Sequence, residues 1–200
     1  MRITGGIWRS RQLAPAVATP VRPTMDRVRK ALFDRLEHLT TVEGAVVADL
    51  FAGTGALGIE ALSRGALYCT FIERNRRLCN VLRQTLCKLE AEPHRYRILV
   101  DDVFRALLHW RELMLPQPQI ILADPPYHMR IGSRLLHTIA QAEWPLHGAF
   151  LCLELSRCEV ISEYPEGWQF HSERLFGDTR IQWWLWHGRS NAPRTLPGHL

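Results

Sequence analysis

The sequence of 200 residues has no apolar run long enough to span a membrane, since a transmembrane helix needs about 20 such residues. Its start, MRITGG, does not resemble the apolar segment of a secretory signal, which predicts a cytoplasmic location. The five cysteines include no Cys-x-x-Cys pair. An odd number of cysteines without that spacing predicts reduced thiols and no metal site.

Lysine is scarce too: Lys30 and Lys88 are the two lysines among 25 basic residues. The charge is uneven, because residues 1–35 hold eight cations and two acids and therefore carry +6. The total is +5, which leaves −1 for residues 36–200. Arginine presents a planar set of donors that binds phosphate in a bidentate manner and stacks on bases. We interpret the basic segment as a nucleic-acid-binding arm, with an ordinary solvated arm as the alternative.

We expect the chain to divide into a basic arm with a first helix over 1–36, an α/β domain over 37–187 and a flexible polar tail over 188–200. Within the domain, apolar runs alternate with helical patterns before a final hairpin. The expected strands are 45–51, 68–73, 97–100, 120–123 and 149–155, the helices are 57–64, 76–89, 103–113 and 134–142, and the hairpin strands are 168–176 and 180–186. This order predicts a doubly wound, mostly parallel twisted sheet with an antiparallel C-terminal hairpin.

Two features of the arm bear on how it is held. Thr24 or Asp26 is expected to cap the helix that follows the arm. Trp8, which lies among arginines, is expected to pin the arm to the body, and stacking on a base is the alternative.

A glycine-rich loop follows the first predicted strand. Residues 53–58, GTGALG, match the G-x-G-x-x-G pattern between a strand and a helix, and Glu73 lies twenty residues beyond Gly53 at the end of the next strand. Ligands of such sheets lie at the carboxyl ends of the strands, where an acidic residue can accept hydrogen bonds from ribose hydroxyls. The pattern therefore predicts a nucleoside-containing cofactor.

The acidic residue before this loop helps to choose between a dinucleotide and S-adenosylmethionine. A carboxylate at Asp49 would repel a pyrophosphate but suits the ammonium group of a methionine. Hydrogen bonding to loop amides is a compatible structural role for Asp49. Asp102, after the third strand, is expected either to bind the adenine amine or to cap the next helix. Phe51 is expected to line the pocket or to belong to the core.

The motif Asp124-Pro125-Pro126-Tyr127 follows the fourth strand and indicates the chemistry. Two prolines fix the backbone, so the Asp124 carboxylate and the Pro125 carbonyl can be held as convergent acceptors. Convergent acceptors hold the N–H groups of an exocyclic amine, and Tyr127 offers a face on which a base can stack. Such a reaction needs positioning and electrostatics, without a metal or a protein nucleophile.

The motifs together resemble the RsmD family, bacterial enzymes that methylate a guanine N2 of small-subunit (16S) ribosomal RNA. The resemblance rests on Asp-Pro-Pro-Tyr, the loop Phe-Ala-Gly-Thr-Gly and the arm, and it extends through Gly177-Asp178-Thr179. The arm contributes Arg2-Ile3-Thr4-Gly5-Gly6-x-Trp8-Arg9-Ser10-Arg11-x-Leu13 and Arg22-Pro23-Thr24-x-Asp26-Arg27-Val28-Arg29-x-x-Leu32-Phe33. The resemblance implies a Rossmann-like class I S-adenosylmethionine-dependent methyltransferase that uses no metal, with residues 37–187 as its methyltransferase domain.

The resemblance also implies roles for single residues. Glu73 would bind the ribose hydroxyls and Asp102 the adenine, while the Asp49–Gly55 turn, with Phe51 and Gly53, would hold the methionine part. Asp124 and Pro125 would orient the guanine amine, followed by Pro126 and the stacking Tyr127. The RNA contacts would be Arg9, Arg11, Arg22, Arg27 and Arg29, although Arg22 and Asp26 are alternatively expected to brace the arm against the cofactor site. The implied partner is ribosomal RNA within an assembled or late-precursor small subunit, and a monomer is the default.

Three other functions fit parts of the sequence. A DNA adenine-N6 methyltransferase would use the same Asp-Pro-Pro-Tyr motif, but the chain leaves little room for a target-recognition domain. A non-catalytic RNA-binding assembly factor would need neither that motif nor the glycine loop. A dinucleotide oxidoreductase is disfavoured by Asp49 and by the lack of a Tyr-x-x-x-Lys motif or an obvious histidine for hydride transfer.

Overall fold

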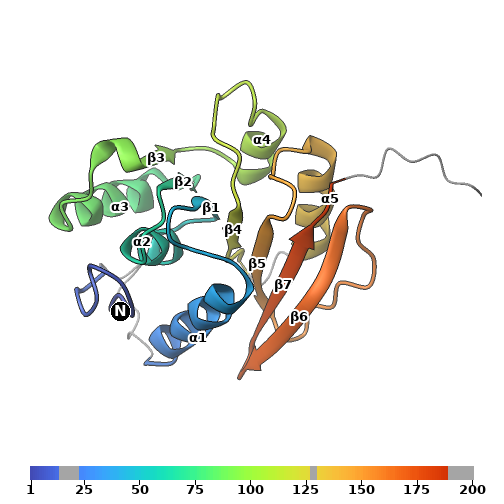
Figure 1. Ribbon diagram of the computed structural model, residues 1–200, viewed down its shortest axis with the longest axis horizontal. Coiled ribbons are helices and arrows are strands. Elements are labelled where there is room, and N and C mark those ends of the chain that lie inside the picture. The colour runs from blue at the N-terminus through green and yellow to red at the C-terminus, as the bar shows by residue number, and fades with distance from the viewer. Residues whose placement is uncertain (14–22, 127–129, 189–200) are drawn as a thin grey trace, which may run out of the picture.

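A computed structural model of the protein describes residues 1–13, 23–126 and 130–188. Its strands form one seven-stranded sheet in the order β3-β2-β1-β4-β5-β7-β6 (Figure 1). The strands are β1 (Val46–Leu50), β2 (Tyr68–Ile72), β3 (Tyr96–Leu99), β4 (Ile120–Ala123), β5 (Phe150–Ser156), β6 (Trp168–Phe176) and β7 (Thr179–Trp186). Neighbours among β1 to β5 pair in parallel, whereas β7 pairs antiparallel with both β5 and β6. The predicted mostly parallel sheet with an antiparallel C-terminal hairpin is confirmed.

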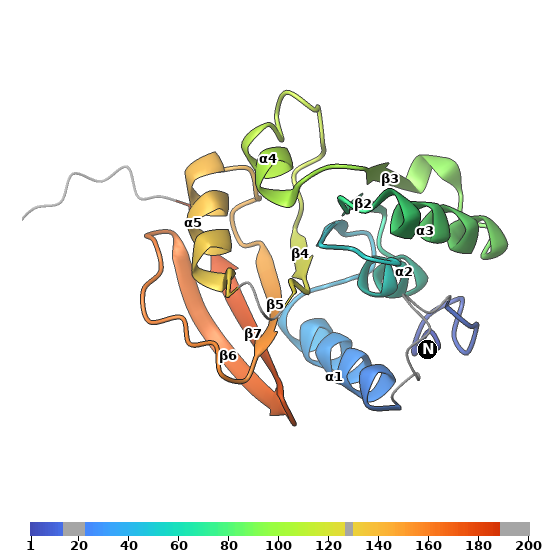
Figure 2. The same cartoon turned by 180° about the vertical axis from the view of Figure 1, so that it is seen from behind.

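Helices cover both faces of the sheet. They are α1 (Pro23–Leu39), α2 (Ala56–Ser63), α3 (Arg76–Lys88), α4 (Val103–Leu108) and α5 (Gly132–Ala142), with a short 3-10 helix, η1, at Pro93–Arg95. Apolar residues of α1, α2 and α3 share one core cluster with the sheet, and those of α4 and α5 share a second. Figure 2 shows α5 lying across β7. The central strands are buried on both faces, as expected for a parallel sheet.

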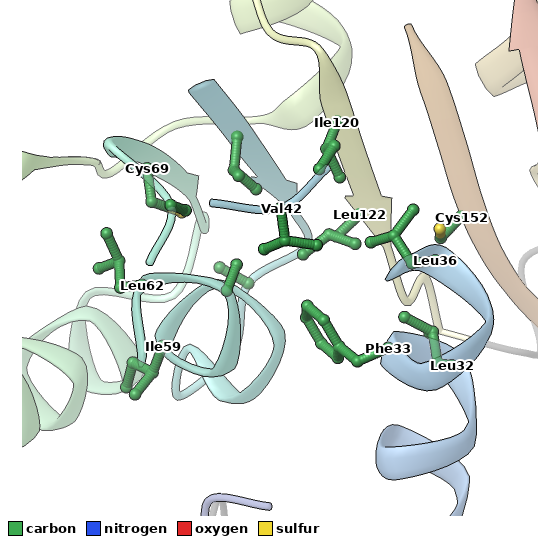
Figure 3. Close-up of a cluster of buried hydrophobic side chains, with 14 of the residues drawn as sticks. Leu32, Phe33, Leu36, Val42, Ile59, Leu62, Cys69, Ile120, Leu122 and Cys152 are labelled. Carbon is green, nitrogen blue, oxygen red and sulfur yellow. The ribbon is translucent and has the colours of Figure 1, made fainter. Parts of the chain in front are cut away.

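Helix α1 belongs to the same core as the sheet. Its residues Phe33 and Leu36 are fully buried. In Figure 3, Leu36 points toward Leu122 of β4 and Cys152 of β5, while Phe33 extends toward α2. The apolar spacing along α1 therefore produced the packing face that periodicity predicts.

Two local predictions were wrong. The fourth helix ends at Leu108 instead of residue 113, and turns follow it. Helix α1 begins at Pro23, so Thr24 and Asp26 both lie inside its first turn and neither is its N-cap. The Asp26 carboxylate instead accepts a hydrogen bond from the backbone N–H of Arg2 at 3.2 Å, which fastens the arm to α1. This agrees with the alternative in which Asp26 braces the arm.

The described part of the arm, residues 1–13, folds back on itself and docks on α2. An isolated antiparallel bridge joins Arg2 to Gln12. Trp8 is buried, and its backbone N–H donates to Ser63 Oγ at 2.9 Å. At Gly6, φ is +75° and a Cβ atom would lie 1.7 Å from the carbonyl oxygen of Ser63, so only glycine allows this close approach. The predicted pinning role of Trp8 is confirmed.

A buried carboxylate completes this docking. Glu60 on α2 has no exposed surface and accepts hydrogen bonds from the backbone and hydroxyl of Thr4 at 2.8 and 2.7 Å. It also pairs with Arg29 of α1 and with Arg64. The arm, α1 and α2 are therefore joined at one charged centre.

No helix among the described residues is both long and apolar enough to cross a membrane.

Candidate active site

A cavity of about 1040 Å³ opens at the carboxyl ends of β1, β2, β3 and β4. This edge is where open α/β sheets bind their ligands, because the loops that follow the strands converge there. The lining comprises Phe51–Thr54, Ala56, Leu57, Glu73–Asn75, Leu78, Asp101–Phe104, Asp124–Pro126, Arg134, Glu154 and Phe176–Thr179, together with Met1, Val28 and Arg29.

The loop after β1 has the backbone geometry that its glycines predict. Gly53 and Gly55 have φ values of +58° and +84°, which L side chains rarely adopt. A Cβ atom on Gly55 would lie 2.3 Å from Leu82 Cδ1, so this glycine lets α2 pack on α3. A Cβ on Gly53 would meet nothing closer than 4.0 Å, so its bare backbone is open to a ligand. Phe51, also at positive φ, lines the cavity and packs edge-on against Phe104.

Glu73 is held at the edge of the cavity by backbone donors. Its Oε2 accepts the N–H of Gly53 at 3.0 Å, and its Oε1 accepts the N–H of Asn75 at 2.7 Å. Both oxygens are thus fixed between the glycine loop and the start of α3. A carboxylate oxygen has a second lone pair, so Glu73 retains capacity to accept hydroxyl groups from a ligand.

Asp102 caps α4, as one of its two predicted roles requires, and its contact with adenine stays a prediction. Its Oδ1 accepts the N–H of Arg105 at 3.2 Å, which makes it the N-cap of α4, and the residue also lines the cavity. The neighbouring Asp101 lines the cavity as well and pairs with Arg105. Two carboxylates at the end of β3 favour a ligand group that donates hydrogen bonds.

Asp49 lies below the loop and is not among the described residues that line the cavity. It is buried, and its Oδ2 accepts the N–H of Gly58 at 2.8 Å. Burial, with a smaller contribution from the negative charge of Glu73, raises the pKa of Asp49 to about 7. The structural alternative for Asp49 therefore fits this geometry better than direct contact with an ammonium group.

Asp124 follows β4 directly and faces the cavity. The residue is exposed to the cleft, and the protein around the cavity withdraws its carboxyl group in part from water. This desolvation, and then the charges of Glu154 and Asp49, raise the pKa of Asp124 well above its usual range. Pro125 and Pro126 line the cavity beside it, and Tyr127 lies outside the described residues.

The predicted RNA contacts divide into exposed and buried arginines. Arg9, Arg11 and Arg27 are exposed, whereas Arg22 lies outside the described residues. Arg29 is 4% exposed, and its guanidinium pairs with Asp26 at 2.9 Å and Glu60 at 3.2 Å and donates to the Arg2 carbonyl. The expectation that Arg29 contacts RNA does not fit this burial, because its Nε and Nη2 atoms already bind groups of the protein.

The sequence pointed to none of three further groups at the cavity. Glu154 of β5 lies beside Asp124, Arg134 of α5 stacks over Phe104 at 3.8 Å, and the β6–β7 turn closes one side. Glu154 and Arg134 belong to no motif, and the Gly177-Asp178-Thr179 motif of the turn carried no predicted role. The positions of all three groups depend on strand register and helix packing. Among the described residues, no group of three or more histidine, cysteine or acidic residues is placed to hold a metal ion.

Comparison with known proteins identifies the family. The family model described as Conserved hypothetical protein 95 matches residues 1–185, from the arm to the last strand. The chain belongs to this family. A member from Escherichia coli (strain K12), "Ribosomal RNA small subunit methyltransferase D", is 32% identical over 177 residues, which cover 88% of this chain and 85% of the relative. The predicted RsmD family is confirmed.

Solved structures give the fold. "Putative methyltransferase yhhF from Escherichia coli" is 28% identical with a TM-score of 0.80 and covers 94% of this chain and 99% of its own. "A putative sam-dependent methyltransferase from Streptococcus mutans" is 14% identical with a TM-score of 0.66, over 89% of this chain and 52% of its own. This chain therefore has the class I S-adenosylmethionine-dependent methyltransferase fold.

Proposed function

We propose that this protein transfers a methyl group from S-adenosylmethionine to the exocyclic N2 of a guanine in small-subunit ribosomal RNA. The observation that carries the proposal is Asp124-Pro125-Pro126 at the end of β4, in one cavity with the glycine loop and Glu73. The names of relatives in the family, which include a small-subunit ribosomal RNA methyltransferase, support RNA as the substrate.

The residues of the cavity fit the cofactor. Its ribose and adenine present hydroxyl and amine donors, and Glu73 and Asp102 offer carboxylate acceptors along the edge of the sheet. The open backbone of Gly53 admits close approach of the methionine part, and Phe51 supplies an apolar wall. When bound, S-adenosylmethionine supplies a methyl group activated by its positively charged sulfur.

Asp124 would act on the substrate amine. A carboxylate that accepts an N–H of N2 orients the nitrogen, and the negative charge stabilises the positive charge that grows as the N–C bond forms. The methylated nitrogen then releases one proton to the carboxylate or to water. Pro125 and Pro126 restrict the backbone and thereby hold this acceptor in place.

The arm and the start of α1 supply exposed cations for RNA. Trp8 and Arg11 contact the C-terminal ends of α2 and α3, whereas the cavity lies at the N-terminal ends of these helices. Met1, Val28 and Arg29 line the cavity, and the exposed Arg9, Arg11 and Arg27 lie on the arm and on α1. Docking of the arm on α2 would therefore place cations for RNA phosphates at a fixed position relative to Asp124. Exposed arginines favour binding to the phosphate backbone.

The test is methyl transfer from labelled S-adenosylmethionine to small subunits that lack native methylation, to naked 16S ribosomal RNA and to duplex DNA. We expect label in a guanine of the subunit, released as N2-methylguanosine on nucleoside analysis. Label in N6-methyladenine of DNA would instead establish the alternative reaction. Bound cofactor without label in any substrate would contradict the proposal. Asp124→Ala serves as the inactive control.

A further inference from the structure

A second carboxylate lies next to Asp124 in the cavity. Strands β4 and β5 pair in parallel with Ala123 opposite Leu153, so Asp124 and Glu154 take the next positions in register. Residues in register on parallel strands project to the same face. Both residues line the cavity, and Glu154 is half-buried.

Two neighbouring carboxylates favour a ligand that donates hydrogen bonds, because each carboxylate oxygen can accept more than one. The charge of Glu154 contributes to the raised pKa of Asp124, which shows that the two groups interact through space. A ligand that presents donors on two adjacent atoms relieves the repulsion, because each carboxylate then accepts one hydrogen bond.

The Watson–Crick edge of guanine has this pattern, since N1–H and the N2 amine lie side by side. Adenine presents its N6 amine beside N1, which is an acceptor, and cytosine presents its N4 amine beside N3, also an acceptor. A carboxylate facing such a lone pair is repelled. We propose that Glu154 accepts the N1–H of the target guanine while Asp124 holds the N2 amine, so that the pair selects guanine.

This inference rests on the proposed guanine-N2 function and adds the residue that determines the base. A well-placed pair of hydrogen bonds to a base edge discriminates against the wrong base by about 5- to 150-fold. The same argument explains how one Asp-Pro-Pro motif serves guanine here, although the motif alone also fits adenine.

The test compares guanine with 2-aminopurine at the mapped target position, in reconstituted small subunits. 2-Aminopurine keeps the 2-amino group but has an acceptor at N1. For the wild-type enzyme we expect kcat/KM to be at least about tenfold higher with guanine. For Glu154→Gln we expect lower activity on guanine and a ratio nearer one, because the amide can donate an N–H to N1.

Glu154→Asp is the matched variant, since it keeps the acceptor and shortens the side chain. It should lose activity on guanine while it keeps the preference for guanine over 2-aminopurine. A wild-type ratio near one overturns the inference, as does a Glu154→Gln ratio equal to that of wild type. The wild-type measurement decides even where a variant does not fold. Failure to methylate guanine at all would count against the proposed function itself, so the two failures are distinguishable.

Discussion

The guanidinium of Arg29 lies 3.2 Å from the carboxylate of Glu60, in a buried ion pair that joins α1 to α2. The exposed fractions of the two side chains are 4% and 0%. Because α2 begins at the glycine loop, this pair connects the arm with the helix that shapes the proposed cofactor site. Its contribution is structural, and it should be measurable as stability.

We expect Glu60→Gln to lower the free energy of unfolding by about 3–5 kcal/mol, since two buried arginines, Arg29 and Arg64, lose a charged partner. Urea denaturation measures this change. The matched control is Lys30→Gln, which removes the exposed ion pair with Asp34 and should cost less than about 1 kcal/mol. Equal, small losses in the two variants would contradict the structural role of Glu60.

The raised pKa of Asp49 leads to a prediction about how the free energy of unfolding depends on pH. Its pKa is raised to about 7 in the folded protein, above the ordinary value of 3.8. The stabilisation from its protonated form is fully present below about pH 4 and is lost as the pH rises through about 7. Relative to Asp49→Asn, wild type should therefore lose up to about 4 kcal/mol of stability between pH 4 and 8.

Unfolding curves of wild type and Asp49→Asn at several pH values check this expectation, and curves that stay parallel from pH 4 to 8 would refute it. The same variant tests the role of Asp49 toward the cofactor. Since Asp49 does not line the cavity, calorimetry should give nearly unchanged affinity for S-adenosylmethionine. A large loss of affinity would instead support the predicted contact between Asp49 and the ammonium group of the cofactor.

Asp124→Ala should abolish turnover with little change in cofactor affinity, because Asp124 lines the cavity and, in the proposed function, contacts the substrate amine and not the cofactor. The raised pKa of Asp124 also predicts a pH profile. Only the carboxylate form accepts two hydrogen bonds freely, so kcat/KM should fall as the pH falls through a midpoint above the usual carboxylate range. Glu154→Gln should move that midpoint down, since it removes the neighbouring charge. A profile that stays flat from pH 5 to 8 would exclude this role.

The sequence predicted those site residues whose positions follow from chain order alone. Glu73 and Asp124 each come directly after a buried strand, and parallel strands end at one edge of the sheet, so their convergence needed no knowledge of packing. The glycine loop was predictable for the same reason. Its positive φ angles follow from residue type.

Residues that depend on tertiary packing were not predictable. Arg29 lies among other arginines and looks like part of a basic surface, and its burial depends on Glu60, which comes 31 residues later. Glu60 itself lies in a short apolar helix, where a single acid is usually exposed. Glu154 becomes Asp124's neighbour through the register of β4 and β5, which no local pattern specifies.

The exposed arginines of the arm give the last prediction. Arg9→Ala combined with Arg11→Ala should weaken RNA binding and flatten its dependence on salt concentration by a slope of roughly 1–2, since each lost phosphate contact releases about one counterion fewer. The matched control is Arg97→Ala with Arg111→Ala. These two arginines are exposed too. Arg97 lies in β3 and donates to the Leu113 carbonyl, and Arg111 follows α4 and donates to the Glu143 carbonyl, so neither belongs to the arm. Because both double variants lose the same net charge, a general electrostatic effect would flatten both slopes equally. A change confined to the arm variant would instead identify the arm as the surface that contacts phosphate, and binding titrations from low to high salt distinguish the two results.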